Sequence, residues 1–127
     1  MVFYLENLEF LKENTNLTEL SLIDCHISDI SGIENCTNLK KLNLSGTTNG
    51  FSNLEPLKNM NLLEELNLNN CNGIYDSYNN VQNLEILADL HKNGALNTLY
   101  FGGNSSIIDW TPLTELGWQQ KSGSFKK

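Results

Sequence analysis

The sequence of 127 residues contains no arginine, and all eight of its basic residues are lysines. Bidentate recognition of phosphate depends on the guanidinium group, and nucleic-acid-binding proteins usually carry a clustered basic face. The formal net charge is −7, and the lysines concentrate only at one adjacent pair and in the C-terminal tail. The composition therefore argues against direct binding of nucleic acid.

Long hydrophobic runs are also missing. No apolar stretch approaches the roughly 18 residues that a membrane-spanning helix needs, so no membrane span is predicted. Residues 1–6 have neither a basic start nor an apolar stretch long enough for a signal peptide. We expect a cytoplasmic protein, and a secreted or cell-surface location stays open if a leader was removed.

Residues that could carry out catalysis or hold a metal ion are few. The two histidines, His26 and His91, have no partner at metal-ligand spacing, and no phosphate-cradling glycine loop occurs. His26 directly follows Cys25, and neighbours on an extended segment point to opposite sides, so they cannot act as a base and a nucleophile together. We predict no enzymatic activity, no cofactor and no metal site.

The chain does contain a recurring leucine spacing, L-x-x-L-x-[LF]. Its four copies begin 22, 24 and 33 residues apart. Such a period is typical of a solenoid, in which each unit buries its apolar face against the next unit. The copies occupy residues 17–22, 39–44, 63–68 and 96–101.

A second apolar series precedes every copy, at twelve, nine and six residues before its first leucine. The rows are Leu5, Leu8 and Leu11; Ile27, Ile30 and Ile33; Phe51, Leu54 and Leu57; and Leu84, Leu87 and Leu90. A fifth row, Ile107, Trp110 and Leu113, lacks the leucine that should follow, since Gln119 stands there. We predict one domain over 1–127, with a half repeat at 5–16, repeats starting near 17, 39, 63 and 96, and a degenerate repeat and tail at 107–127.

The run from Ile27 to Leu44 resembles the leucine-rich repeat family, in particular the 22-residue class of bacterial internalin-like proteins. The resemblance implies an α/β solenoid that forms a right-handed superhelix. About four short parallel strands would lie on its concave face, and helical or extended segments on its convex face. It also implies a protein partner and a non-enzymatic, protein-binding role.

Two columns of polar or small residues agree with this register. Asn7, Asp29 and Asn53 stand where a short side chain can accept hydrogen bonds from the free amides of a helical turn. Cys25 and Cys71 share the column at the turn that leaves each strand, with Thr47 between them. Two strand spacings put the cysteine backbones roughly 9.6 Å apart, beyond the reach of a disulfide. Unpaired cysteines favour a reducing compartment.

The concave face can be predicted residue by residue, because strand side chains alternate between the two faces. We predict that a partner binds there, and the alternative that this polar face is only solvated stays open. The residues concerned are Glu19, Ser21, Ile23, Lys41, Asn43, Glu65, Asn67, Asn69, Thr98 and Tyr100.

The third repeat is longer than the others and contains a polar insertion. Tyr75 and Tyr78 in the 72–80 loop are candidate anchors for a partner, because tyrosine offers contact area and a hydroxyl at low entropic cost. The spacing after the loop predicts an α-helix near 81–92, with Asn80 as its cap and Gly94 at its end. Its apolar residues would be Val81, Leu84, Leu87 and Leu90.

Three hypotheses follow for the function. The first is a non-enzymatic protein-protein interaction module that binds an unidentified protein through the concave face and the 72–80 loop. The second is a small acidic cytosolic inhibitor or effector that blocks a basic site on a target enzyme. The third is a fragment of a larger internalin-like surface protein. The first apolar layer lacks a polar cap, so the solenoid ends also favour homo-oligomers.

Overall fold

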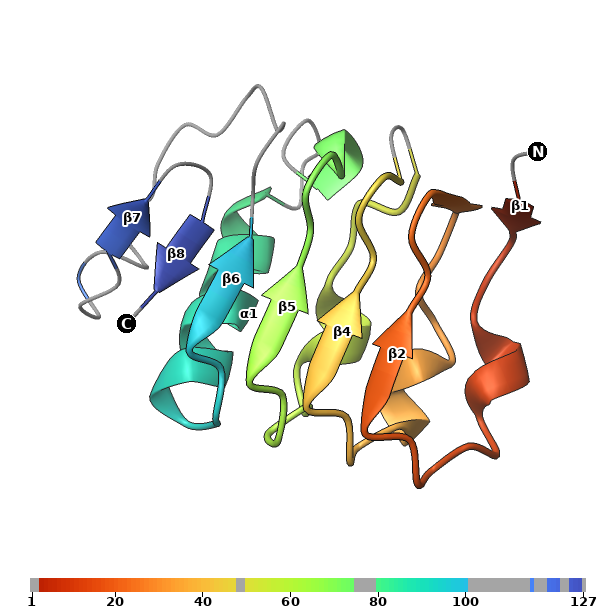
Figure 1. Ribbon diagram of the computed structural model, residues 1–127, viewed down its shortest axis with the longest axis horizontal. Helices are drawn as coiled ribbons and strands as arrows, with labels where there is room; N and C mark the ends of the chain where they lie inside the picture. The colour runs from red at the N-terminus through yellow and green to blue at the C-terminus, as the bar shows by residue number, and fades with distance from the viewer. Residues whose placement is uncertain are drawn as a thin grey trace.

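The main sheet of the molecule is built from the predicted repeats. In the computed structural model, four three-residue strands lie parallel and follow one another in chain order (Figure 1). Their middle residues, all leucines, are in register, which confirms the alignment of the four motifs. The strands are β2 (Glu19–Ser21), β4 (Lys41–Asn43), β5 (Glu65–Asn67) and β6 (Thr98–Tyr100). The structure describes residues 3–47, 50–74, 80–100, 115, 119–121 and 124–126.

Short helical segments return the chain behind the sheet. The 3-10 turns are η1 (Glu9–Leu11), η2 (Ile33–Asn35), η3 (Glu55–Leu57) and η4 (Asn72–Ile74), and the single α-helix described is α1 (Asn80–Lys92). No helix in the described part of the chain is long and apolar enough to cross a membrane. The right-handed sense implied by the family resemblance stays a prediction.

The predicted capping column is confirmed at all three of its described positions. The side-chain oxygen of Asn7 accepts a hydrogen bond from the backbone N–H of Glu9 at 3.0 Å. Asp29 and Asn53 do the same for the residues two positions after them, at 2.9 and 2.8 Å. Each side chain thus satisfies an amide at the start of a short helical turn or, for Asp29, two residues before it.

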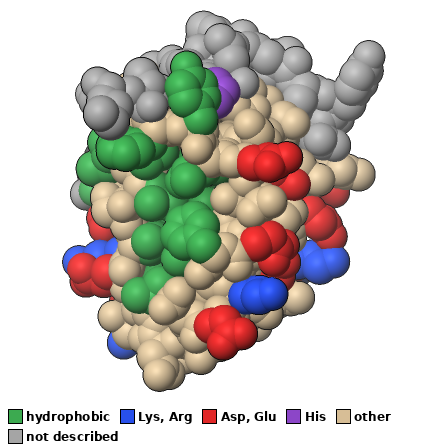
Figure 2. Space-filling view, turned by 90° about the vertical axis from the view of Figure 1, so that its right-hand side faces the viewer, with side chains coloured by type: hydrophobic (Ala, Val, Ile, Leu, Met, Phe, Trp, Pro, Cys, Tyr) green, Lys and Arg blue, Asp and Glu red, His purple; other side chains and the backbone are tan. Residues whose placement is uncertain are grey.

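The core is a stack of apolar layers between the strands and the returning segments. The leucines of the repeats starting near 39 and 63 are at most 1% exposed, namely Leu39, Leu42, Leu44, Leu63, Leu66 and Leu68. Their counterparts in the first repeat, Leu17, Leu20 and Leu22, are only partly buried. No described layer covers them, and Figure 2 shows hydrophobic side chains gathered over this end of the solenoid.

The helix α1 lies close to the predicted range 81–92, but not all of its apolar residues are buried. Leu84, Leu87 and Leu90 are buried, whereas Val81, the first of the four apolar residues at this spacing, is 61% exposed. A three-residue step falls about 60° short of a full helical turn, so four such positions cannot share one face. The fully buried polar residue Asn83 lies on the inward side instead.

Three strand pairings were not predicted. The strand β1 (Phe3–Leu5) pairs in parallel with β3 (Cys25–Ile27), forming a small second sheet. At the other end, β7 (Gln119–Lys121) and β8 (Ser124–Lys126) extend the main sheet beyond β6. Both are antiparallel, with β8 next to β6. The prediction of a degenerate repeat and tail at 107–127 therefore missed a strand pair that continues the sheet (Figure 1).

The cysteine column at the strand exits is a hydrogen-bonded ladder. The Thr47 hydroxyl donates to the Cys25 carbonyl at 2.7 Å, and the Cys71 thiol donates to the Leu44 carbonyl at 3.1 Å. Each side chain thus bonds the main chain of the repeat before it. All three cysteines, including the buried Cys36 on the opposite wall, are free thiols.

Candidate functional site

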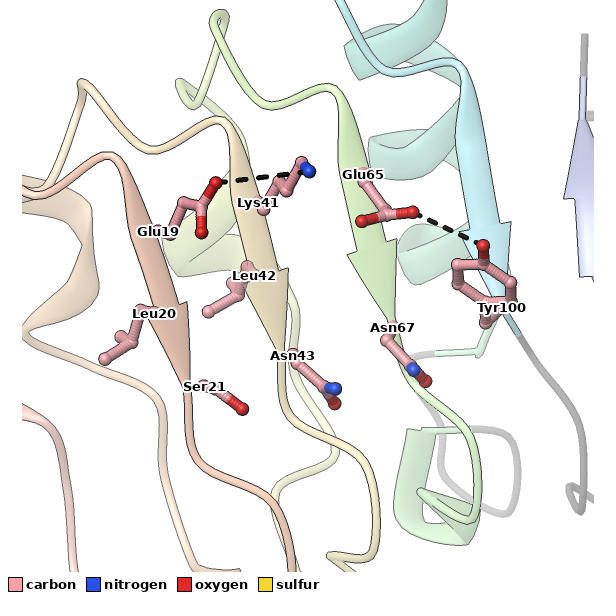
Figure 3. A pocket seen from close by; sticks show the side chains of 9 residues that line it. All are labelled: Glu19, Leu20, Ser21, Lys41, Leu42, Asn43, Glu65, Asn67 and Tyr100. Atoms are coloured by element: carbon pink, nitrogen blue, oxygen red, sulfur yellow. Dashed lines mark hydrogen bonds and ion pairs between the residues drawn. The ribbon is translucent and has the colours of Figure 1, made fainter.

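The face of the main sheet that points away from the core, which is the predicted concave face, carries two rows of side chains. One row runs across the strands through Glu19, Lys41, Glu65 and Thr98, and the next through Ser21, Asn43, Asn67 and Tyr100. Between them the surface forms an open hollow of about 430 Å³ (Figure 3). Its lining residues are Glu19, Leu20, Ser21, Lys41, Leu42, Asn43, Glu65, Asn67 and Tyr100.

The sequence places these side chains outward through simple alternation. The leucine in the middle of each strand points into the core, so the residues on either side of it point away. At the strand exits the chain turns sharply through residues with positive φ, namely Asp24 (57°), Gly46 (89°) and Asn70 (59°). A side chain on Gly46 would also collide with Asp24, since its Cβ would lie 2.1 Å from the Asp24 Oδ1 atom.

Two asparagines of the hollow are held in place by these turns. The Asn43 Oδ1 atom accepts a hydrogen bond from the Ser45 N–H, and the Asn67 Oδ1 atom accepts one from the Asn69 N–H, both at 3.0 Å. The side-chain oxygens are therefore occupied, while the Nδ2 groups have no acceptor among the described residues. The hollow offers fixed hydrogen-bond donors to whatever binds there.

The charged groups of the hollow are unevenly paired. The Lys41 ammonium lies 4.0 Å from the Glu19 carboxylate, and both side chains are more than half exposed. The Tyr100 hydroxyl donates to the Glu65 Oε1 atom at 3.3 Å. Partial burial, the negative charge of Glu65 and this hydrogen bond, in that order, raise the pKa of the Tyr100 hydroxyl above its ordinary value. Tyr100 therefore stays protonated and keeps donating at neutral pH.

The structure brings together most of the residues that the sequence pointed to, although binding itself stays a prediction. Seven of them line the hollow: Glu19, Ser21, Lys41, Asn43, Glu65, Asn67 and Tyr100. Ile23 is 53% exposed beyond the end of β2, and Asn69 and Thr98 are half-buried beside the hollow. Tyr75 and Tyr78 lie outside the described residues.

Sequence reasoning missed how far the sheet extends. The register sets Lys126 opposite Thr98 and Ser124 opposite Tyr100, so the backbone of β8 extends the sheet beyond β6. Nothing in the leucine spacing indicated this, because the tail carries no repeat motif.

The two histidines have structural contacts. The His26 ring lies 5.2 Å from the Tyr4 ring, and the His91 Nδ1 atom lies 2.6 Å from the Leu96 carbonyl oxygen. Within the described ranges, no group of three or more histidine, cysteine, aspartate or glutamate side chains could hold a metal ion.

Comparison with known proteins identifies the repeat type. Residues 15–59 match the family model "Leucine Rich repeats (2 copies)". Among solved structures, the chain is similar to the internalin InlF of Listeria monocytogenes, with 30% sequence identity and a TM-score of 0.70. The match covers 87% of this chain and 29% of the internalin chain. No curated protein sequence matches the chain.

Proposed function

Because this chain is an internalin-like leucine-rich repeat protein, we propose that it is a non-enzymatic protein-protein interaction module whose partner binds on the concave face. The supporting observation is the hollow across β2, β4, β5 and β6. Its side chains come from four strands in register and include polar groups that have no partner among the described residues. A rigid sheet holds such groups in place before a partner arrives, which lowers the entropic cost of binding.

The 72–80 loop is proposed to add contacts at one edge of this face. It follows β5 in the chain; its residues 72–74 form η4, and its last residue, Asn80, begins α1. Tyr75 and Tyr78 remain its candidate anchors on the sequence argument. Tyr78→Ala should weaken capture of a partner without changing stability.

Capture of a partner from a lysate of the source organism tests the proposal with two charge-matched variants. Ser21→Arg places a bulky cation in the hollow, at a side chain that has no hydrogen bond to the described residues. Gln82→Arg adds the same charge on the exposed side of α1. We expect Ser21→Arg to lose a partner that Gln82→Arg keeps. A partner retained equally by both variants would place the binding surface elsewhere.

The acidic inhibitor remains the second candidate, and it is favoured by the charge of the chain, −7. Binding to a basic site on an enzyme would weaken steeply with ionic strength, because exposed charges are screened beyond about 10 Å at 0.1 M salt. Capture that is insensitive to salt argues against this candidate.

The three free thiols support the cytoplasmic location that we propose.

We also propose that two copies of the chain pair through the edge of β2. Among described residues no strand lies on its outer side. The main-chain groups of Thr18 and Leu22 bond to the next repeat, at 2.7 and 2.8 Å, so those of Glu19 and Ser21 point outward. Beside this edge lie the partly buried leucines of the first layer (Figure 2). Unpaired strand edges next to apolar surface favour association.

A two-fold axis at Ser21 gives the most favourable antiparallel register for such a pair. Glu19 then lies opposite Ile23 of the second copy, and Leu20 lies opposite Leu22, so no like charges meet. Ser21→Pro removes an outward N–H without breaking a bond inside the chain, and Ser21→Ala is its matched control. Light scattering should find a dimer for the wild type and Ser21→Ala but not for Ser21→Pro. A wild type that stays monomeric at high concentration contradicts the pairing.

A further inference from the structure

The Glu65 carboxylate occupies the middle of the concave face with an incomplete set of partners. Its one contact among the described side chains is the Tyr100 hydroxyl, at 3.3 Å. The neighbouring ammonium of Lys41 pairs with Glu19 instead, at 4.0 Å. Figure 3 shows Lys41 between the two carboxylates, with its ion pair directed to Glu19. Glu65 therefore has no cationic partner among the side chains that the structure describes.

Lys41 cannot neutralise both carboxylates of this row, whichever way its side chain points. Along the register, Glu19, Lys41 and Glu65 are consecutive, so two carboxylates share one ammonium. Whichever carboxylate Lys41 approaches, the other has no cationic partner among the described side chains. The ion pair itself is weak, because 60% of the Lys41 side chain and 69% of the Glu19 side chain are exposed.

The surroundings of Glu65 suit a long, positively charged side chain. The half-buried Tyr100 ring stands beside the carboxylate, and an aromatic face attracts a lysine ammonium or an arginine guanidinium. On the row below, the Asn43 and Asn67 oxygens are bonded to turn amides, and their Nδ2 groups have no acceptor among the described residues. Donors of this kind fit main-chain carbonyls of a bound protein segment.

We propose that Glu65 and Tyr100 form a subsite for a lysine or arginine side chain of the protein partner, with Asn43 and Asn67 holding the adjacent main chain. The cation pairs with the Glu65 carboxylate, and the aliphatic stem lies along the Tyr100 ring. The subsite rests on the proposed concave-face function and gives that function its chemical specificity. Lys41 competes with the incoming cation for the same carboxylate.

Small-molecule probes test the subsite on the full chain labelled with ¹⁵N. The probes are the Nα-acetyl methylamides of arginine, lysine and norleucine, of which norleucine is a neutral analogue of lysine. We expect the two cationic probes to shift the signals of Glu65, Tyr100 and the Asn43 and Asn67 side-chain amides with a saturable curve. The norleucine probe should leave these signals unchanged.

Variants sharpen the test because they move the affinity in opposite directions. Glu65→Gln should weaken the arginine probe about threefold to tenfold, the range of a partly exposed ion pair with a cation–π contact. Tyr100→Leu should weaken it as well, whereas Tyr100→Phe keeps the ring and most of the affinity. Lys41→Met should strengthen binding, an outcome that loss of folding cannot imitate.

Several results would overturn the subsite. These are equal shifts from the norleucine probe, unchanged arginine binding by Glu65→Gln, or shifts spread over the acidic surface with none centred on Glu65. The outcome is separable from that of the proposed function. If Glu65→Gln binds a captured partner as tightly as the wild type while Ser21→Arg has lost it, the concave face binds but this subsite does not.

Discussion

At the scale of the residue, the fold depends on side chains that satisfy the main chain at the strand exits. Such positions could be predicted from the sequence, because the column of Cys25, Thr47 and Cys71 and the column of Asn7, Asp29 and Asn53 recur at fixed offsets. The sequence predicts that each of these side chains bonds a main-chain group, but not which group it is. Which carbonyl each side chain reaches depends on how neighbouring repeats stack, and local spacing does not contain that information.

Thr47 gives the most direct test of this ladder. Its hydroxyl is buried and donates to the Cys25 carbonyl at 2.7 Å. Thr47→Val keeps the shape but leaves that carbonyl without this donor, which should lower the free energy of unfolding by about 1–2 kcal/mol. Thr47→Ser keeps the hydroxyl and should cost less. Urea denaturation measures both, and a valine variant more stable than the serine variant would show that the methyl group matters more.

Cys71 makes stability depend on alkaline pH. Burial raises the pKa of its thiol from 9.0 to about 11, while hydrogen bonds from the main chain of Thr47 and Gly46 act weakly in the other direction. Between pH 9 and 11 the unfolded chain therefore loses a proton that the folded chain keeps. The free energy of unfolding should fall across this window by about 2 kcal/mol because of Cys71.

The matched control for this prediction is Cys71→Thr, which introduces the residue type that the neighbouring repeat has at Thr47. Lysines and tyrosines titrate in both proteins alike, so the difference between them isolates the thiol. Urea denaturation at pH 8 and pH 10.5 supplies the four values. Equal losses of stability in the two proteins would contradict the assigned role of burial.

At the scale of the element, the period of the apolar series explains what could be predicted about each segment. Steps of three residues keep side chains on one face of a 3-10 turn, which has 3.0 residues per turn. Only the last residue of each row, Leu11, Ile33 or Leu57, lies in such a turn, and all three are buried. In the α-helix α1 the same steps drift around the axis, so Val81 is exposed and Asn83 faces inward.

Asn83 fastens α1 to the rest of the solenoid through three hydrogen bonds. Its Oδ1 atom accepts from the Leu54 N–H at 2.9 Å, and its Nδ2 group donates to the Ser52 and Ile74 carbonyls at 2.8 and 3.1 Å. Asn83→Leu should lower the free energy of unfolding by about 2–4 kcal/mol, since buried main-chain groups lose their partners. Gln82→Leu, on the exposed side of the same helix, should change it by less than about 0.5 kcal/mol.

Thermal and urea unfolding of these two variants check the prediction. An Asn83→Leu protein as stable as the wild type would mean that apolar packing replaces the hydrogen bonds without cost. The sequence could not reveal this role, because an asparagine inside a helix usually points to solvent. Only the stacking of α1 on the segment before η3 makes its inward position useful.

At the scale of the whole molecule, the solenoid and its concave rows could be predicted, whereas its two ends could not. Repeats specify their neighbours through shared leucine positions, so the order and register of β2, β4, β5 and β6 follow from the spacing. The pairings of β1 with β3 and of β8 with β6 join short segments that carry no repeat motif. Such pairings depend on contacts between segments far apart in the chain.

The central claim is that the concave face binds a protein, and the side-chain amide signals of the asparagines test it most directly. Asn43 and Asn67 carry free Nδ2 groups on the concave face, while Asn53 makes the same type of turn hydrogen bond on the opposite side. On titration with a captured partner, the Asn43 and Asn67 amide signals should shift and the Asn53 signal should stay. A shift confined to Asn53, with Asn43 and Asn67 unchanged, would contradict the account.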